Sequence, residues 1–324
     1  MAIDPSIADL FTRIASAGPA ADPPLPVAER RDQIEAGFAA MMLALPSGPT
    51  FDDVTVVETT VAGPERDIPV RVFRPSGDER DLPALLYFFG GGFWMRSYNS
   101  PDIVGACRQI SSQARVVVVE IDYALAPEHP FPAALGEGQA VLEWMATGAA
   151  EHRIDSSRLA VGGQSAGGGL ALSLALRLRD AGGPSVLLQV LEVPAVDISP
   201  LQFDTELPEG VAASDLDSLT EITDFYLPTG MSPENPAVSP GRTDDLSGLP
   251  ATLVVNAEND LLRPSGERFA DRLRAAGVPV VSTTYGGQVH NSPGLSGISA
   301  GSRAWREQVS WAVRTLHSAN GPLS

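Results

Sequence analysis

The sequence predicts an α/β protein in which helices flank a mostly parallel central sheet. Three observations favour this class. The run at 115–121 (RVVVVEI) is almost continuously apolar, as expected for a strand that is buried on both faces of a parallel sheet. Beyond this run, helix-like and strand-like patterns alternate towards the C-terminus. The 324 residues are 44% hydrophobic and 19% charged, which is enough apolar material for the core of a large globular fold.

The expected elements follow one another along the chain. The runs at 54–61 and 68–73 read as strands of the antiparallel type, and a further strand at 84–89 precedes a helix at 100–113. After the strand at 115–121, helices are expected at 132–147, 166–181, 266–276 and 302–317, and strands at 159–163, 186–193, 252–257 and 278–284.

Two segments lie outside this alternation. Residues 1–50 are expected to form helices interrupted by proline-rich stretches. Residues 197–250 are long and rich in proline, yet 216–227 (LDSLTEITDFYL) has the pattern of an amphipathic helix. An insertion of that length is usually a lid or a binding element. We therefore expect 1–50 and a second insertion at about 197–245 to form a helical cap over the core, which is the rest of 51–324.

Composition excludes several classes of partner. A net charge of −18 argues against nucleic acid and anionic membrane surfaces, because both are bound through basic patches. Cys107 is the only cysteine, so an intrachain disulfide and a four-cysteine zinc site are excluded. The first 18 residues carry acids where a secretion signal needs positive charge, and the longest apolar run, 82–94, is too short to span a bilayer. We expect a cytoplasmic protein with a small-molecule substrate and no membrane contact; its oligomeric state stays open, with a homodimer as one option.

A serine lies between glycines in GGQSAGGG, at 162–169. The pattern G-x-S-x-G around Ser165 also occurs in flexible glycine-rich turns. Here a strand leads in and a helix leads out, which is the context in which a tight turn presents a nucleophilic serine at the edge of a sheet. A dinucleotide site also uses glycines after a strand, but no G-x-G-x-x-G occurs at this point.

A nucleophilic serine needs a base and an acid that orients the base. His290 follows a strand in the turn-rich YGGQVHNSPG, whereas the other three histidines are expected in a proline-rich loop or in polar surface segments. Asp260 ends the strand in ATLVVNAEND and precedes a helix. The order Ser165, Asp260, His290 is the one that hydrolases with this serine motif use, although a surface role remains the alternative for the acid and the histidine.

Three successive glycines follow the third strand in YFFGGGFW, at 87–94. Backbone N–H groups in such a loop can point at one place without obstruction by side chains, which suits the stabilisation of an oxyanion. The alternative is a plain glycine hinge.

These motifs resemble those of the hormone-sensitive-lipase-like (bacterial family IV) carboxylesterases, which have the α/β-hydrolase fold. DYALAPEHPFPAAL at 122–135 resembles the family's DYRLAPEHPFPAAL, and GQSAGG, AENDLLR and FGGGFW resemble GDSAGG, AE-x-DPLR and HGGGFW. The resemblance covers residues from about 50 to the end and, more loosely, the N-terminal cap. It implies a cap built from the N-terminus and from an insertion after the sixth strand, and no cofactor. It also implies a catalytic triad of Ser165, Asp260 and His290. The oxyanion hole would be formed by the backbone N–H groups of Gly91, Gly92 and Ala166.

The chain departs from the family pattern near the expected site. Phe89 replaces the histidine before the three glycines, and Asn291 follows the histidine where glycine is usual. Gln164 and Ala124 replace an acid and an arginine that could form an ion pair, so both charges are absent together. Glu192 is an acid in a strand position where an apolar residue is usual.

The leading hypothesis is a serine carboxylic-ester hydrolase that acts on short, uncharged acyl esters through an acyl-enzyme. A covered pocket limits chain length, and an acidic surface repels anions. Candidate substrate contacts, for which core packing is the alternative, are Phe89, Phe93, Trp94, Met41, Phe203, Phe225 and Asn291.

Two other functions remain open. A biosynthetic relative could perform acyl transfer, cyclisation or elimination, because Phe89 makes the site drier and so disfavours water as the second nucleophile. The second alternative is a small-molecule binding protein with a hydrolase fold that has lost catalytic activity. The intact triad argues against this alternative. We expect no metal, since no histidine or cysteine cluster has metal-ligand spacing.

Overall fold

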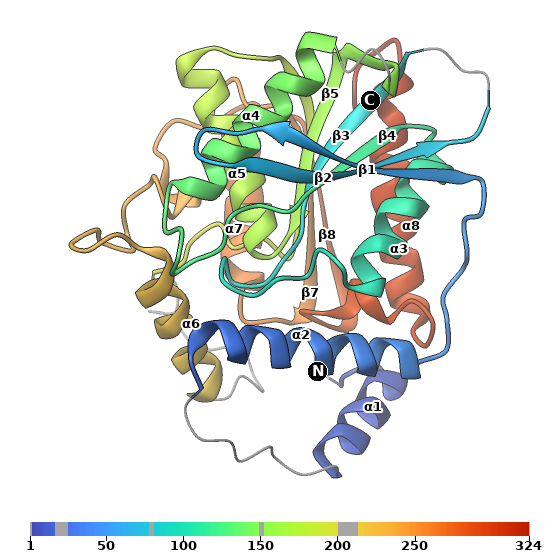
Figure 1. Ribbon diagram of the computed structural model, residues 1–324, viewed down its shortest axis with the longest axis vertical. Coiled ribbons are helices and arrows are strands. Elements are labelled where there is room, and N and C mark those ends of the chain that lie inside the picture. The colour runs from blue at the N-terminus through green and yellow to red at the C-terminus, as the bar shows by residue number, and fades with distance from the viewer. Residues whose placement is uncertain (1, 17–24, 78–80, 149–151, 200–212, 324) are drawn as a thin grey trace.

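The computed structural model describes residues 2–16, 25–77, 81–148, 152–199 and 213–323, and Figure 1 shows the arrangement of their helices and strands. In this part of the chain eight strands form one sheet in the order β1-β2-β4-β3-β5-β6-β7-β8. Strand β2 is antiparallel to both of its neighbours, and all other neighbours are parallel. The predicted α/β class with a mostly parallel sheet is therefore confirmed. The strands are β1 (Val54–Ala62), β2 (Asp67–Pro75), β3 (Leu82–Phe88), β4 (Val117–Ile121), β5 (Ile154–Gln164), β6 (Val186–Glu192), β7 (Ala251–Asn259) and β8 (Val280–Val289).

Helices cover both faces of the sheet. Helices α3 and α8 pack together on one face, and α4, α5 and α7 lie on the other (Figure 1). The bounds in the described ranges are α1 (Pro5–Ser16), α2 (Val27–Ala44), α3 (Pro101–Ala114), α4 (Ala133–Gly148), α5 (Ala166–Ala181), α6 (Ala213–Tyr226), α7 (Arg263–Ala275) and α8 (Ala300–Arg314), with 3₁₀ turns η3 (Pro240–Arg242), η4 (Ser292–Leu295) and η5 (Thr315–His317).

The core lies on both sides of the central strands. Every residue of β3 and β4 is buried, as the continuous apolar pattern of the strand at 115–121 predicted. Several strands are longer than expected, and β5 and β8 extend furthest, because pairing continues past residues that interrupt the apolar pattern. β5 begins at Ile154, which pairs with Leu82 of β3, and β8 continues to Val289, which pairs with Asn259 of β7.

Helices α1, α2 and α6 gather at one end of the molecule (Figure 1). Helix α1 packs Ile7 and Leu10 against Val289 and Leu295. The expected division into a cap and a core stays a prediction, and residues 200–212 of the second cap segment lie outside the described residues.

Two features are absent from the described residues. None of their helices combines the length and apolar character needed to cross a membrane. No three His, Cys, Asp or Glu side chains in the same ranges come close enough together to hold a metal ion.

Candidate active site

Ser165 lies in the turn between β5 and α5. Its φ of 55° and ψ of −118° are strained for a residue with a side chain. The Ser165 N–H donates to the carbonyl of Glu192 at 2.8 Å, and the Ser165 carbonyl accepts from the N–H of Ala195 at 3.0 Å. These backbone bonds connect the turn to the end of β6 and to the segment that follows it, and they hold the strained conformation in place.

Glycines on either side of the serine allow the turn to approach β3. A Cβ atom on Gly163 would lie 2.5 Å from the carbonyl oxygen of Phe88, and one on Gly167 would lie 2.2 Å from it. Neither distance is tolerable for a carbon and a backbone oxygen. The close packing of the turn on β3 therefore requires glycine at both positions.

The structure brings the three residues of the expected triad together. His290 Nε2 lies 2.8 Å from Ser165 Oγ, and His290 Nδ1 lies 2.8 Å from Asp260 Oδ2. The other carboxylate oxygen of Asp260 accepts from the N–H of Leu262 at 2.9 Å. The Asp260 side chain is 2% exposed and that of His290 is 34% exposed, so the acid is buried while the imidazole keeps an accessible edge.

The surroundings of His290 act on its pKa in opposite directions. Burial lowers the pKa of His290, but the charge of Asp260 and its hydrogen bond raise that pKa by more, so it lies above the ordinary value of 6.5. The imidazole is therefore a stronger base than an isolated histidine, which suits the acceptance of a proton from a serine hydroxyl.

The glycine-rich loop after β3 lies beside this serine. A Cβ atom on Gly90 would be 3.3 Å from Ser165 Cβ. Gly91 and Gly92 have φ values of 136° and 58°, a region that glycine adopts without strain. Ala166 is fully buried in the first turn of α5, where backbone N–H groups have no partner within the helix. The backbone N–H groups expected to form an oxyanion hole thus come from two segments, the loop after β3 and the first turn of α5.

Phe89 packs the start of the glycine-rich loop against the core. Its ring is fully buried and stacks on Tyr123 with 4.2 Å between ring centroids, and the Tyr123 hydroxyl donates to the Phe89 carbonyl at 3.0 Å. The Phe89 ring therefore faces Tyr123 in the core, and a contact between Phe89 and substrate stays a prediction. The apolar ring takes the place of the family's histidine by packing rather than by hydrogen bonding.

Aromatic side chains of the loop contact α6. Phe93 stacks on Tyr226 with 3.9 Å between centroids, and Trp94 meets Phe225 edge to face at 5.4 Å. A Cβ atom on Gly92 would lie 2.9 Å from the Ile222 side chain, so α6 directly covers the loop. Of the other expected contacts, Met41 is half-buried on α2, Asn291 is exposed where η4 begins, and Phe203 lies outside the described residues.

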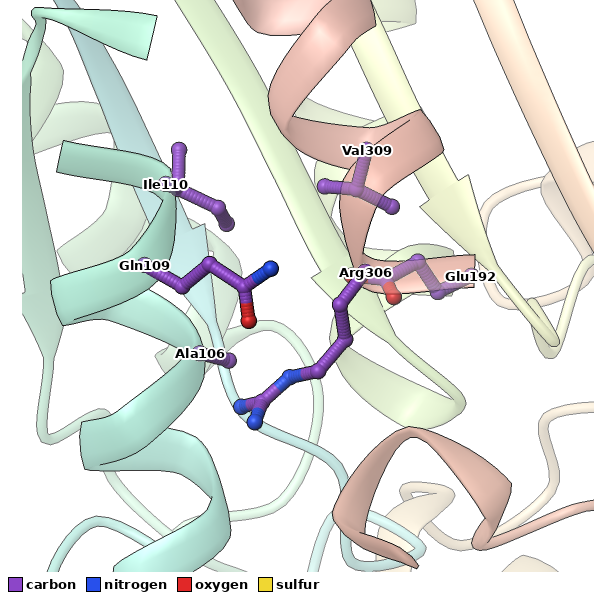
Figure 2. A pocket seen from close by; sticks show the side chains of 6 residues that line it. All are labelled: Ala106, Gln109, Ile110, Glu192, Arg306 and Val309. Carbon is purple, nitrogen blue, oxygen red and sulfur yellow. The ribbon is translucent and has the colours of Figure 1, made fainter. Parts of the chain in front are cut away.

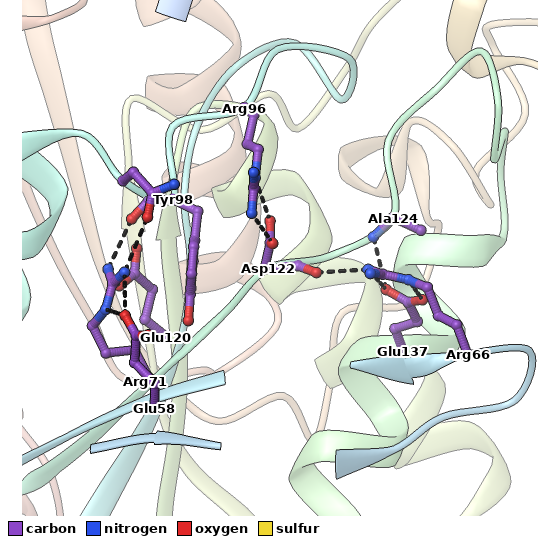
Figure 3. A network of polar contacts seen from close by, with 10 residues as sticks. Glu58, Arg66, Arg71, Arg96, Tyr98, Glu120, Asp122, Ala124 and Glu137 are labelled. Carbon is purple, nitrogen blue, oxygen red and sulfur yellow. Dashed lines mark hydrogen bonds and ion pairs between the residues drawn. The ribbon is translucent and has the colours of Figure 1, made fainter. Parts of the chain in front are cut away.

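A polar network holds the segment that follows the loop (Figure 3). Arg71 of β2 donates to the Tyr98 carbonyl at 2.9 Å and to Glu120 Oε2 at 3.0 Å. Arg96 donates through Nε to Asp122 at 3.0 Å. Sequence analysis missed these residues, because Arg71 comes from an antiparallel strand with no motif of its own.

The same network includes two charged side chains, Glu137 and Arg66, close to the backbone of Ala124. Its N–H donates to Glu137 Oε2 at 2.7 Å, and Arg66 pairs with Glu137 at 2.7 Å (Figure 3). Arg66 also donates to the carbonyl of Asp122 at 2.6 Å. A guanidinium group from the turn between β1 and β2 thus supplies positive charge next to the position where the family has its arginine.

Glu192 is buried next to the turn at Ser165. Its carboxylate accepts from the Tyr87 hydroxyl and from Trp305 Nε1, both at 2.8 Å. Burial raises the pKa of Glu192, and it raises that of Tyr87 well above its usual value. A small cavity of about 10 Å³ lies between α3 and α8 at this point, with Gln109 and Arg306 on its two sides (Figure 2). Sequence analysis singled out Glu192 but did not identify these partners, which come from two distant elements.

Comparison with known proteins identifies the family of this chain. Residues 85–293 match the family described as alpha/beta hydrolase fold. Esterase LipI of Mycobacterium tuberculosis is 36% identical over 262 residues, which cover 78% of this chain and 80% of the relative. An ethyl acetate hydrolase of Pseudomonas putida is 30% identical over 90% of this chain and 92% of its own length.

A solved structure covers almost the whole chain. The hyperthermophilic esterase of the archaeon Pyrobaculum calidifontis superposes with a TM-score of 0.86 at 31% identity, over 98% of this chain and 99% of that one. Together these likenesses support a hydrolase that acts on small-molecule esters. The chain belongs to the α/β-hydrolase fold family, in its hormone-sensitive-lipase-like branch, and is a carboxylesterase-type serine hydrolase.

Proposed function

We propose that Ser165 is the nucleophile of this esterase, His290 its general base and Asp260 the acid that orients the histidine. His290 Nε2 takes the hydroxyl proton as Ser165 Oγ attacks the ester carbonyl, and it then protonates the leaving alcohol. Water, activated by the same imidazole, hydrolyses the acyl-enzyme and releases the acid. The two contacts of 2.8 Å that join these three side chains are the observation that carries the proposal.

The backbone N–H groups of Gly91, Gly92 and Ala166 stabilise the oxyanion of each tetrahedral intermediate. Two observations support this assignment: the loop lies next to Ser165, and Ala166 is in the first turn of α5. Donors that are already oriented lower the barrier without reorganisation, and a single such donor contributes about 10²- to 10³-fold in rate.

The preferred substrates are short, uncharged acyl esters. Ile222 and Phe225 of α6 lie over the oxyanion loop, which supports a pocket that is closed above the reacting carbonyl. The net charge of −18 disfavours anionic substrates. The relative named ethyl acetate hydrolase points in the same direction, because the ester in its name has a two-carbon acyl group.

A covalent probe tests the nucleophile. An aryl phosphonate should add one mass increment at Ser165, and Ser165→Ala should abolish labelling and lower kcat by roughly 10⁴- to 10⁶-fold. Ser173→Ala is the matched control, because Ser173 is a half-buried serine of α5. This variant should keep the labelling at Ser165 and the wild-type kcat. Full activity in Ser165→Ala would overturn the assignment.

The same assay tests substrate preference with p-nitrophenyl esters of two to twelve acyl carbons. We expect kcat/KM to peak at four carbons or fewer, and a maximum at the longest chains would contradict the closed pocket. Product analysis with an added alcohol shows whether acid release or acyl transfer dominates, and we expect release of the acid.

A further inference from the structure

Helix α2 contacts the oxyanion loop although it has no buried face of its own. None of its side chains is fully buried. Two consecutive arginines, Arg30 and Arg31, nevertheless reach Trp94, which lies two residues after Gly92. Polar contacts, rather than an apolar stripe, therefore connect this helix to the loop.

Arg31 binds the backbone of the loop and of a neighbouring segment. Its Nε donates to the Trp94 carbonyl at 2.6 Å, and its Nη2 donates to the Ala126 carbonyl at 2.8 Å and to Glu128 at 2.7 Å. The N–H of Ala126 in turn donates to the Phe93 carbonyl at 3.0 Å. The guanidinium group thus joins three acceptors that lie far from it in sequence, which its planar set of donors suits.

The contact with Trp94 reaches the expected oxyanion donors through one short turn. The Gly91 carbonyl accepts from the N–H of Trp94 at 3.2 Å and from the N–H of Met95 at 2.8 Å. Residues 91–95 therefore form a hydrogen-bonded unit, and a shift of the Trp94 carbonyl also moves the N–H groups of Gly91 and Gly92.

We propose that Arg31 is a positioning residue that holds the N–H groups of Gly91 and Gly92 in the geometry that stabilises the oxyanion, an inference that rests on the proposed function. Its side chain is only 13% exposed, so the bonds to the two carbonyls are largely shielded from competing water. Helix α2 thereby helps to position the N–H groups of Gly91 and Gly92, in addition to any role in covering the site.

Arg30 provides a matched control on the same helix. Its guanidinium lies 4.4 Å from the centroid of the Trp94 ring and pairs with Glu221 of α6 at 2.6 Å. Arg30 therefore contacts the Trp94 side chain, whereas Arg31 contacts the Trp94 backbone. Replacement of either arginine removes one positive charge from α2, but only replacement of Arg31 releases the loop carbonyl.

The test compares Arg31→Ala, Arg31→Lys and Arg30→Ala on a matched ester and thionoester. The C=S bond is longer and its sulfur is a poor acceptor, so the thionoester gains little from well-placed oxyanion donors. A displacement of the donors by about 1 Å should lower kcat for the ester by about 10- to 100-fold in Arg31→Ala, with KM and the thionoester rate changed much less. Arg31→Lys should be intermediate, because an ammonium group cannot reach all three acceptors, and Arg30→Ala should keep kcat within about threefold.

Added guanidinium ion shows whether Arg31 positions the loop or only stabilises the fold. At concentrations below those that unfold the protein, it should restore part of the ester activity of Arg31→Ala and none of that of Ser165→Ala. Equal losses for ester and thionoester without rescue, or unchanged kcat in Arg31→Ala, would overturn the proposal. Phosphonate labelling of Ser165 in every Arg31 variant keeps this result distinct from failure of the proposed function, in which the wild-type protein would not be labelled at Ser165.

Discussion

The two sides of the candidate active site are held in different ways. The turn at Ser165 is fixed by neighbouring backbone: the serine N–H bonds to Glu192, and Gly163 and Gly167 pack against the Phe88 carbonyl. Even a methyl group would clash with backbone atoms at those two glycines. This side of the site is therefore built from adjacent strands and from the start of one helix.

The glycine-rich loop after β3 is held by side chains that come from far along the chain. Tyr123 bonds to the Phe89 carbonyl from 34 residues away, and Arg31 bonds to the Trp94 carbonyl from 63 residues away. Such contacts can be weakened by degrees, whereas a steric clash at a glycine cannot. We therefore expect changes that displace the turn at Ser165 to cost more activity than changes around the loop.

After Ser165 itself, the largest effect is expected from the acid that contacts the histidine. Asp260→Asn should lower kcat by about 10⁴-fold, because the amide no longer stabilises the imidazolium or selects its tautomer. In the wild-type protein kcat/KM should rise with pH through the pKa of His290, which lies above 6.5, since only the neutral imidazole accepts the serine proton.

The pH profile of the residual activity sharpens this prediction. Asp260 raises the pKa of His290, so its replacement lowers that pKa and the rise in activity should move to lower pH. Rates measured from pH 5 to pH 10 would show the shift. An inflection that stays in place would mean that Asp260 does not act on the titrating group.

A single methyl group tests the turn. Gly167→Ala places a Cβ atom 2.2 Å from the Phe88 carbonyl oxygen, so the turn must move away from β3. We expect activity to fall by about 100-fold or more and the free energy of unfolding to fall by about 1–3 kcal/mol.

Gly136→Ala is the control for this change. Gly136 also lies in a helix, but a Cβ atom there would meet only Pro64 Cγ at 3.7 Å, which is ordinary contact. This variant should keep its activity and gain about 0.5–1 kcal/mol of stability, because alanine favours the helix. Similar activities for the two variants would contradict the difference between the turn and the rest of the molecule.

The smallest effect is expected at Glu192, whose side chain lies behind the turn. Burial raises the pKa of Glu192, so over the pH range between its ordinary and its raised value the native state binds a proton that the unfolded state has released. Stability therefore falls as the pH rises through that range. Glu192→Gln should flatten this dependence in urea unfolding at a series of pH values, with little change in kcat.

The amide can keep both contacts of the carboxylate in this variant. Its oxygen can accept from Trp305 Nε1 and its NH₂ group can donate to the Tyr87 hydroxyl. An unchanged pH dependence would show that Glu192 does not titrate in this range. A large loss of kcat would instead make Glu192 part of what positions Ser165.

Much of the fold and of the candidate site could be predicted from local patterns. The continuous apolar run at 115–121 predicted a strand buried on both faces, and β4 is buried throughout. The glycines around Ser165 predicted a tight turn, and the chain order of Asp260 and His290 predicted partners that the structure brings within 2.8 Å. Their catalytic roles stay a proposal.

What the sequence by itself determined is the class of the fold, the order of its elements and the identity of the residues that meet at the end of the sheet. The class and the order of elements follow from the periodicity of apolar residues, and the site residues follow from the glycine-serine motif and from the chain order of the acid and the histidine. Only the tertiary structure decided that Phe89 faces Tyr123, that Glu192 binds Trp305 and that Arg31 binds the Trp94 carbonyl. A hydrogen bond or a ring contact depends on two segments that meet after folding, and neither segment carries a local signal for the other.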